Sequence, residues 1–268
     1  MAVAYQQKDK YDIADLLEIM QLLRSPGGCP WDAAQDHKSI RKDFIEETYE
    51  VIEAINKEDK ALLLEELGDV LMQVVFHAEI EREQGSFDFH DVADGICKKL
   101  IERHPHVFGD VVVSDTGEVL TNWDAIKRKS KHQDTYSSAM DAVPRELPAL
   151  MRSAKIQKKA AMAGFDWKDA DGAFEKLAEE NRELRDAVKS GNTDAIMEEF
   201  GDLLFSAVNV SRFLHIDAEE ALTMATDKFI ARYKLVEAAA SERGIDMKEA
   251  ELSVLDELWE AAKGKITR

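Results

Sequence analysis

Apolar residues recur at intervals of three and four positions along almost the whole chain. One clear run is Ile13, Leu16, Leu17, Met20 and Leu23. In an α-helix this spacing gathers the apolar side chains on one side, where they pack against other helices. The strict alternation that is typical of β-strands is nearly absent. The pattern therefore predicts an all-α fold.

The helical periodicity is lost over residues 128–148. This segment is polar and contains Pro144 and Pro148. Such a composition is typical of a connection between folded units. We therefore predict two helical domains, at residues 1–127 and 149–268, joined by this linker.

The two predicted domains share an internal repeat. The segment EELGDVL begins at Glu65, and EEFGDLL begins at Glu198. Upstream of these, EETYE begins at Glu46 and EENRE begins at Glu179, with the same distance between the two motifs in both halves. A pattern that recurs with constant spacing indicates a duplicated structural unit. We therefore expect two copies of one helical bundle.

The acidic residues of these motifs are candidate metal ligands. Residues three positions apart lie on the same face of a helix, so two such helices can bring four acids together. Carboxylates that converge repel one another unless a cation lies between them. Oxygen donors without thiolate or imidazole suit Mg²⁺ or Mn²⁺. The predicted ligands are Glu47, Glu50, Glu66 and Asp69 in the first half, and Glu180, Glu183, Glu199 and Asp202 in the second.

Two other interpretations of the acidic motifs fit less well. A di-iron bundle needs Glu-x-x-His on two helices, but neither His77 nor His215 has a glutamate three residues before it. A single pair of acids at this spacing is usually a solvated helix face. Because the whole pattern occurs twice, we favour the metal interpretation.

A glycine separates the acids of the second motif in each half. Gly68 and Gly201 lie inside predicted helices, where glycine costs about 1 kcal/mol relative to alanine. Backbone or ligand that comes close to the helix at this point would explain them. We therefore expect a close approach beside both glycines.

The net charge excludes several classes of function. A formal charge of −19 and a pI near 4.8 argue against a nucleic-acid partner, which calls for clustered Lys and Arg. No apolar run is long enough to cross a membrane, and the N-terminal residues are too charged for a signal peptide, so we expect a cytoplasmic protein. A phosphate substrate is compatible with such acidity only if bound divalent cations reverse the local field.

Several motifs carry a family resemblance. The acidic motifs resemble those of the all-α nucleoside triphosphate pyrophosphohydrolases, and their doubled form resembles the MazG family. Other matching segments are PGGCPWD (Pro26–Asp32), KIQKKA, GFDW and RHPHVF. The resemblance spans nearly the whole chain. It implies two tandem MazG-like bundles that form a homodimer and catalyse the Mg²⁺-dependent reaction NTP + H₂O → NMP + diphosphate over a broad range of NTPs and dNTPs.

The resemblance also implies roles for individual residues. The eight acids would bind metal, and Glu180 and Glu199 would act in catalysis, with Glu179 as a candidate that orients water. Lys228 and Arg232 would hold the triphosphate, and Trp259 is either a platform for the base or a core residue. The full set of implied nucleotide contacts is Lys228, Arg232, Trp259 and Lys263, with the first-half equivalents Lys99, Arg103, Trp123 and Lys127.

The two halves are not expected to be equivalent. Pro105 should end the helix that carries Arg103, whereas the sequence after Arg232 continues with helical periodicity. If only one half hydrolyses substrate, we expect it to be the second. His104 and His106 are expected to cap the helix end rather than to bind a ligand.

Two alternative functions stay open at this point. The chain could hydrolyse a narrower set of substrates, such as dUTP, dCTP or damaged nucleotides. It could also be a non-enzymatic helical scaffold that uses its acidic faces to bind partners. Because no Gly-x-x-x-x-Gly-Lys-Ser/Thr loop is present, an energy-coupled ATPase is disfavoured.

Overall fold

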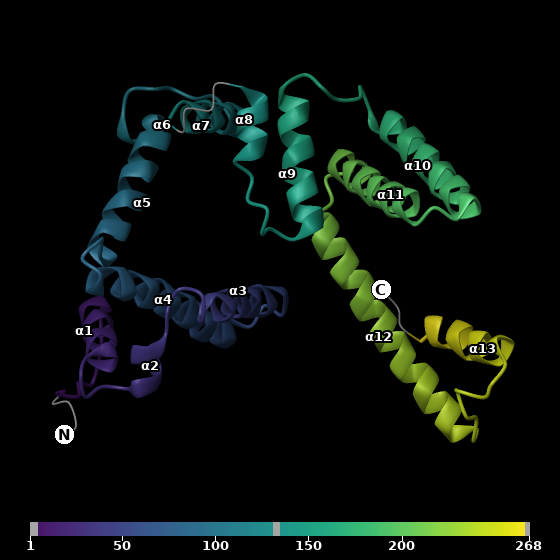
Figure 1. Ribbon diagram of the computed structural model, residues 1–268, viewed down its shortest axis with the longest axis horizontal. Coiled ribbons are helices and arrows are strands. Elements are labelled where there is room, and N and C mark those ends of the chain that lie inside the picture. The colour runs from purple at the N-terminus through teal and green to yellow at the C-terminus, as the bar shows by residue number, and fades with distance from the viewer. Residues whose placement is uncertain (1–4, 131–134, 266–268) are drawn as a thin grey trace. The chain divides into compact units, whose positions relative to one another are not determined.

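The computed structural model describes residues 5–130 and 135–265. Within these ranges all regular structure is helical, which confirms the predicted fold class (Figure 1). The helices are α1 (Ile13–Arg24), α2 (Pro30–Ala34), α3 (Arg41–Asn56), α4 (Lys60–Glu83), α5 (Phe89–Arg103), α6 (Pro105–Phe108), α7 (Thr116–Ser130), α8 (Tyr136–Asp141), α9 (Ala149–Met162), α10 (Ala170–Ser190), α11 (Thr193–Phe213), α12 (Ala218–Glu242) and α13 (Leu252–Lys263). No helix in the described ranges has both the length and the apolar character that a membrane span requires.

The chain divides into two compact units, Met1–Lys127 and Arg128–Arg268. The predicted linker contains the end of α7 and the short helix α8, while its residues 131–134 lie outside the described residues. Helix α8 begins at a capping box, in which the backbone N–H of Ser138 donates to the Thr135 side chain. It then packs against α9. The segment predicted as a linker from its lack of apolar periodicity therefore includes a short helix.

The first unit is built around an α3–α4 hairpin. Helix α1 packs against α4, and the buried core between them includes Met20, Ile40, Val75, Phe76 and Ile80. Apolar residues at helical spacing in α1 and α4 therefore meet in one core, as the sequence pattern predicts.

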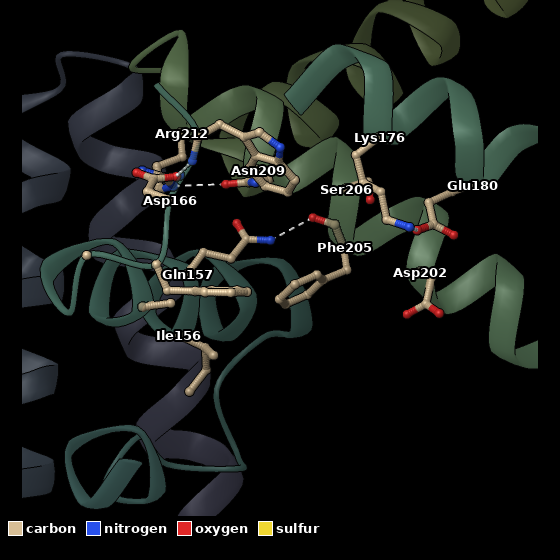
Figure 2. Close-up of a pocket in the computed structure, with 14 residues that line it drawn as sticks. Ile156, Gln157, Asp166, Lys176, Glu180, Asp202, Phe205, Ser206, Asn209 and Arg212 are labelled. Atoms are coloured by element: carbon tan, nitrogen blue, oxygen red, sulfur yellow. Dashed lines mark hydrogen bonds and ion pairs between the residues drawn. The ribbon is translucent and has the colours of Figure 1, made fainter. Parts of the chain in front are cut away.

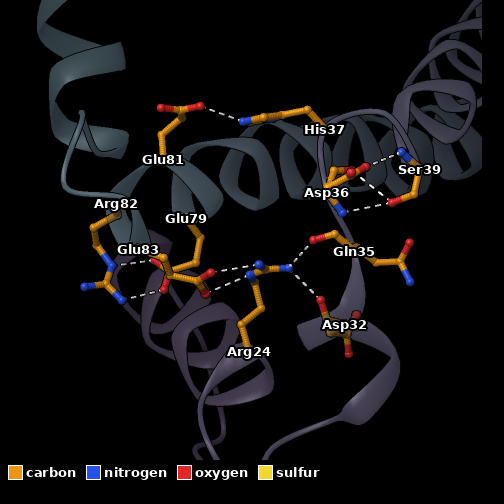
Figure 3. Close-up of polar contacts among 10 residues, drawn as sticks. All are labelled: Arg24, Asp32, Gln35, Asp36, His37, Ser39, Glu79, Glu81, Arg82 and Glu83. Carbon is orange, nitrogen blue, oxygen red and sulfur yellow. Dashed lines mark hydrogen bonds and ion pairs between the residues drawn. The ribbon is translucent and has the colours of Figure 1, made fainter.

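Arg24 joins three segments of the first unit (Figure 3). Its Nε and Nη2 each donate to the Glu83 carboxylate of α4 at 2.8 Å. Its Nη1 donates to the carbonyl oxygens of Asp32 and Gln35, at 2.6 and 3.2 Å, and its guanidinium covers the Phe76 ring. These contacts fix the segment around α2 against the end of the hairpin.

The second unit repeats the hairpin as α10–α11. Gly191 ends α10 with a left-handed φ of 72°, and Asn192 caps α11 by accepting from the backbone N–H of Asp194. Asp59 caps α4 in the same way in the first unit. Helix α9 packs on α11, while α12 packs mainly against α13 and α9. Each hairpin thus joins one helix that carries the first acidic motif to one that carries the second.

Candidate metal centre and pocket

The hairpins bring three of the four predicted ligands together in each unit. Carboxylate oxygens of Glu47, Glu66 and Asp69 lie within 4.8 Å of one another, and so do those of Glu180, Glu199 and Asp202. In each group one acid comes from the first helix of the hairpin and two come from the second, where they lie three residues apart on one helix face. Glu50 and Glu183 lie outside these groups.

Glu50 and Glu183 nevertheless act on the groups electrostatically. Burial raises the pKa of Glu47 and Glu66, and the nearby Glu50 raises both further. Burial likewise raises the pKa of Glu199, with Glu183 as its strongest charged neighbour. The predicted sets of four acids are therefore close neighbours, but only three converge at a single point.

The donor set fits a hard divalent cation. Glu66 and Glu180 are only 8% and 4% exposed, and a buried carboxylate is costly unless a cation or hydrogen bonds stabilise it. All donors in the two groups are carboxylate oxygens. This composition suits Mg²⁺ or Mn²⁺.

Lys176 lies beside the acids of the second group, a position that the sequence did not predict. Its Nζ lies 2.6 Å from Glu180 and 2.9 Å from Glu179. Both carboxylates raise the pKa of Lys176, and the hydrogen bond from Lys176 lowers the pKa of Glu179. A single lysine on an acidic helix resembles an ordinary surface ion pair, so only its contact with the buried Glu180 identifies it.

A pocket of about 640 Å³ opens beside the second group (Figure 2). Lys176, Glu180 and Asp202 line one end of it, and Phe165 and Trp167 from the loop after α9 belong to its wall. A cavity of this size is sufficient for a small organic ligand. The acidic group is therefore accessible from a preformed pocket.

One hydrogen-bond acceptor in the pocket has no partner among the described residues. The Gln157 side-chain amide donates to the carbonyl oxygen of Phe205 at 2.7 Å, while its Oε1 is buried without a partner among the described residues. Arg212 is held by both oxygens of Asp166, at 2.9 and 2.5 Å, and its Nε donates to Asn209. Figure 2 shows Gln157 at one side of the pocket and Lys176 with Glu180 at another.

Trp167 owes its position to a glycine. A Cβ atom at Gly172 would lie 2.2 Å from Trp167 Cδ1 and 2.7 Å from Cγ. The first turn of α10 therefore lies directly against the indole ring, which only glycine allows without a shift. Trp167 is thus held as part of the pocket wall in the second unit.

The predicted nucleotide-contacting residues form two similar groups, one in each unit. The Arg103 guanidinium and the Lys127 ammonium lie over the Trp123 ring, at 5.3 and 4.9 Å from its centroid. Arg232 lies 6.0 Å from the Trp259 centroid. None of these residues lines the pocket beside Glu180.

The Trp259 ring is in contact with other side chains, unlike a ring that is open for a base to stack on. Its ring contacts Phe229, with centroids 5.1 Å apart, as well as Arg232. The Nε atoms of Arg232 and of its counterpart Arg103 are buried without a hydrogen-bond partner among the described residues. Lys228 and Lys99 are exposed, and Lys263 pairs with Glu260 on the same helix. The tryptophans thus support the arginines, whose unpartnered donors suit an anion.

The expectation of close backbone approach at Gly68 and Gly201 is wrong for this chain. A Cβ atom added at either position would meet no atom within 4 Å. Both glycines are exposed on their helices, with open space where a side chain would stand. An approach by a ligand stays a prediction.

The helix ends follow the predicted asymmetry. Helix α5 ends at Arg103, before Pro105, and His104 caps it through a 2.6 Å contact between its Nδ1 and the carbonyl oxygen of Leu100. Helix α12 instead continues ten residues beyond Arg232, to Glu242. Helices α5 and α12, which carry Arg103 and Arg232, therefore differ in how far they continue beyond that arginine.

Comparisons with known proteins identify the family. The MazG nucleotide pyrophosphohydrolase domain matches the chain twice, at residues 35–108 and 171–237, which cover the two hairpins except for the first residue of α10. The chain is 47% identical over 250 residues to the Thermotoga maritima "Nucleoside triphosphate pyrophosphohydrolase/pyrophosphatase MazG", a match that covers 93% of this chain and 95% of that protein. It is 45% identical over 251 residues to the Escherichia coli K12 "Nucleoside triphosphate pyrophosphohydrolase", with 92% and 95% covered. From its duplicated acidic hairpins and these relatives, the chain belongs to the MazG nucleotide pyrophosphohydrolase family.

Proposed function

We propose that this protein hydrolyses nucleoside triphosphates to the monophosphate and diphosphate in a Mg²⁺-dependent reaction, with a broad range of NTP and dNTP substrates. The observation that carries this proposal is the convergence of Glu180, Glu199 and Asp202 beside a 640 Å³ pocket. We place the reaction in the second unit for this reason. The names of the relatives support the same chemistry.

The acidic residues would hold the cation against the triphosphate. Glu180, Glu199 and Asp202 are the candidate Mg²⁺ ligands. Bound Mg²⁺ would neutralise phosphate charge and lower the pKa of water. Lys176 can turn from Glu180 towards a phosphate, and Glu179, freed from Lys176, is the candidate to orient the attacking water.

The pocket would hold the nucleoside. Phe165 and Trp167 provide aromatic faces for a base or sugar. The unpartnered Oε1 of Gln157 can accept a hydrogen bond from an exocyclic amino group. Within the narrower alternative of dUTP, dCTP or damaged nucleotides, this acceptor favours dCTP over dUTP, because only cytosine carries an exocyclic amino group.

The cationic groups on α12 and α13 would bind the phosphate tail. Arg232, with its unpartnered Nε, is the strongest candidate, and Trp259 keeps its guanidinium in place. Because these residues lie outside the pocket, we propose that they join the site when nucleotide binds or when a homodimer forms. Large apolar side chains that are exposed on α11 and α12, among them Phe200, Phe229 and Ile230, are consistent with a homodimer. The cytoplasmic location and the absence of a nucleic-acid partner stay predictions.

Diphosphate release from a panel of NTPs and dNTPs tests the proposal. E199Q should lower kcat/KM by about 100-fold, because it removes a charge that holds the cation against the developing phosphate charge. E198Q, which changes the exposed neighbouring residue, is the matched control, and E66Q tests the first unit separately. A scaffold would release no diphosphate and would show no thermal shift with Mg²⁺. Equal rates for E199Q and E198Q would exclude the proposed site.

A further inference from the structure

The acidic groups of the two units differ by one charged residue. In the second unit, the Lys176 ammonium contacts Glu180 and Glu179. Lys176 lies four residues before Glu180, and the residue four before Glu47 in the first unit is Asp43. Among the ion pairs of the described residues, none involves the acids of the first group. One group thus has an internal cation and the other does not.

This difference changes what a metal ion meets in each unit. The Glu180 side chain is 5% exposed, and its Oε1 lies 2.6 Å from Lys176 Nζ. A divalent cation that binds Glu180 must displace the ammonium or be repelled by it. In the first unit a cation meets only carboxylates, with a further acid, Asp43, one turn away.

The position of Lys176 offers a way to release Glu180. Lys176 lines the pocket together with Glu180 and Asp202, and its side chain is 36% exposed. A triphosphate in that pocket would give the ammonium a new anionic partner. Nucleotide binding would then free Glu180 for the metal.

We propose that the two centres bind metal under different conditions. The first unit binds a divalent cation without nucleotide, whereas the second binds its cation together with the nucleoside triphosphate. Until the nucleotide binds, the Lys176 ammonium occupies the position beside Glu180 that the cation would take. This inference rests on the proposed function, because it takes both acidic groups as Mg²⁺ sites. In this proposal Lys176 determines the order in which metal and nucleotide bind to the second unit. The duplicated acids alone do not imply such an order.

Titration of the full chain with Mn²⁺, with free Mn²⁺ measured by electron paramagnetic resonance, tests this order. Without nucleotide, we expect a tight class of sites that E66Q removes and a class about tenfold weaker that E199Q removes, a ratio that corresponds to one charged hydrogen bond lost. Addition of α,β-methylene-ATP, which resists cleavage between the α and β phosphates, should tighten only the E199Q-sensitive class.

Lys176 is tested with a matched pair of variants. K176M should tighten the E199Q-sensitive class by about tenfold in the absence of nucleotide, because Glu180 loses its competing cation. K189M is the control: Lys189 makes a 2.6 Å ion pair with Asp186 on the same helix, outside the acidic group. It should leave both classes unchanged.

Three results would overturn the inference. These are equal affinities of the two classes in the unaltered protein, a tight class that depends on Glu199 rather than Glu66, and a K176M variant that binds Mn²⁺ as the unaltered protein does. If diphosphate release is still lost in E199Q, the proposed function survives any of them. Mn²⁺ binding that neither E66Q nor E199Q changes would remove the metal centres themselves, and both proposals with them.

Discussion

In the first unit, the surroundings of Glu47 and Glu66 disfavour the ionised form of both side chains. Burial and neighbouring carboxylates raise the pKa of both above the ordinary value of 4.5. The folded protein therefore binds protons on these groups more tightly than the unfolded chain does. Their contribution to stability is present in full below pH 4.5 and is lost as the pH rises through the raised pKa values of the folded state.

This linkage predicts how stability depends on pH. In EDTA, the E47Q/E66Q double variant should lose less free energy of unfolding than the unaltered protein as the pH rises from 4.5 to neutrality, because it lacks two of the groups that must ionise. Urea unfolding at a series of pH values measures the difference. Mg²⁺ at neutral pH should restore the stability of the unaltered protein but not that of the variant. Parallel pH profiles for both proteins would contradict the prediction.

The helical hairpin is the element that the sequence predicted best. The repeated spacing of acids fixed which faces of α3 and α4 would meet, and the structure confirms convergence for Glu47, Glu66 and Asp69. The pocket in the second unit was not predictable, because its wall depends on how the loop that carries Trp167 packs on α10. Lys176 was missed for a similar reason: helical spacing shows that it can reach Glu180, but not that Glu180 is buried.

The contact between Gly172 and Trp167 gives a prediction at the level of the element. G172A should destabilise the second unit by about 1–3 kcal/mol, since the added methyl group overlaps the indole ring and forces it to move. The displaced ring should change tryptophan fluorescence and raise KM for nucleotide. G201A is the matched control: its methyl group meets no protein atom, so it should stabilise α11 by about 1 kcal/mol. Similar unfolding midpoints for the two variants would show that Trp167 is not constrained by α10.

At the scale of the whole molecule, the negative charge opposes the approach of substrate. The formal charge of the chain is −19, and nucleoside triphosphates are also anionic. Long-range repulsion between like charges slows encounter and is screened by salt. In the proposed function, attraction by a bound metal and by Arg232 would act only after the substrate has come within a short distance.

Salt should therefore accelerate the capture of substrate. At saturating Mg²⁺, kcat/KM is expected to rise severalfold between about 20 and 200 mM KCl, because the Debye length falls from roughly 20 to 7 Å. Steady-state rates at low nucleotide concentration give this value directly, and kcat serves as the internal control because it does not include the encounter. A fall in kcat/KM over the same range would show that local cations, not the net charge, govern association.

The helical hairpin also limits how the gene can change in length. In α11, one residue inserted between Asn192 and Glu199 would rotate the rest of the helix by about 100°. Glu199 and Asp202 would then leave the face that Glu180 shares with them, although no residue had been substituted. The acidic motifs keep the same spacing in both halves, as a requirement for a fixed helical phase would dictate. We therefore expect the protein to accept insertions and deletions outside the motif-bearing helices but not within them.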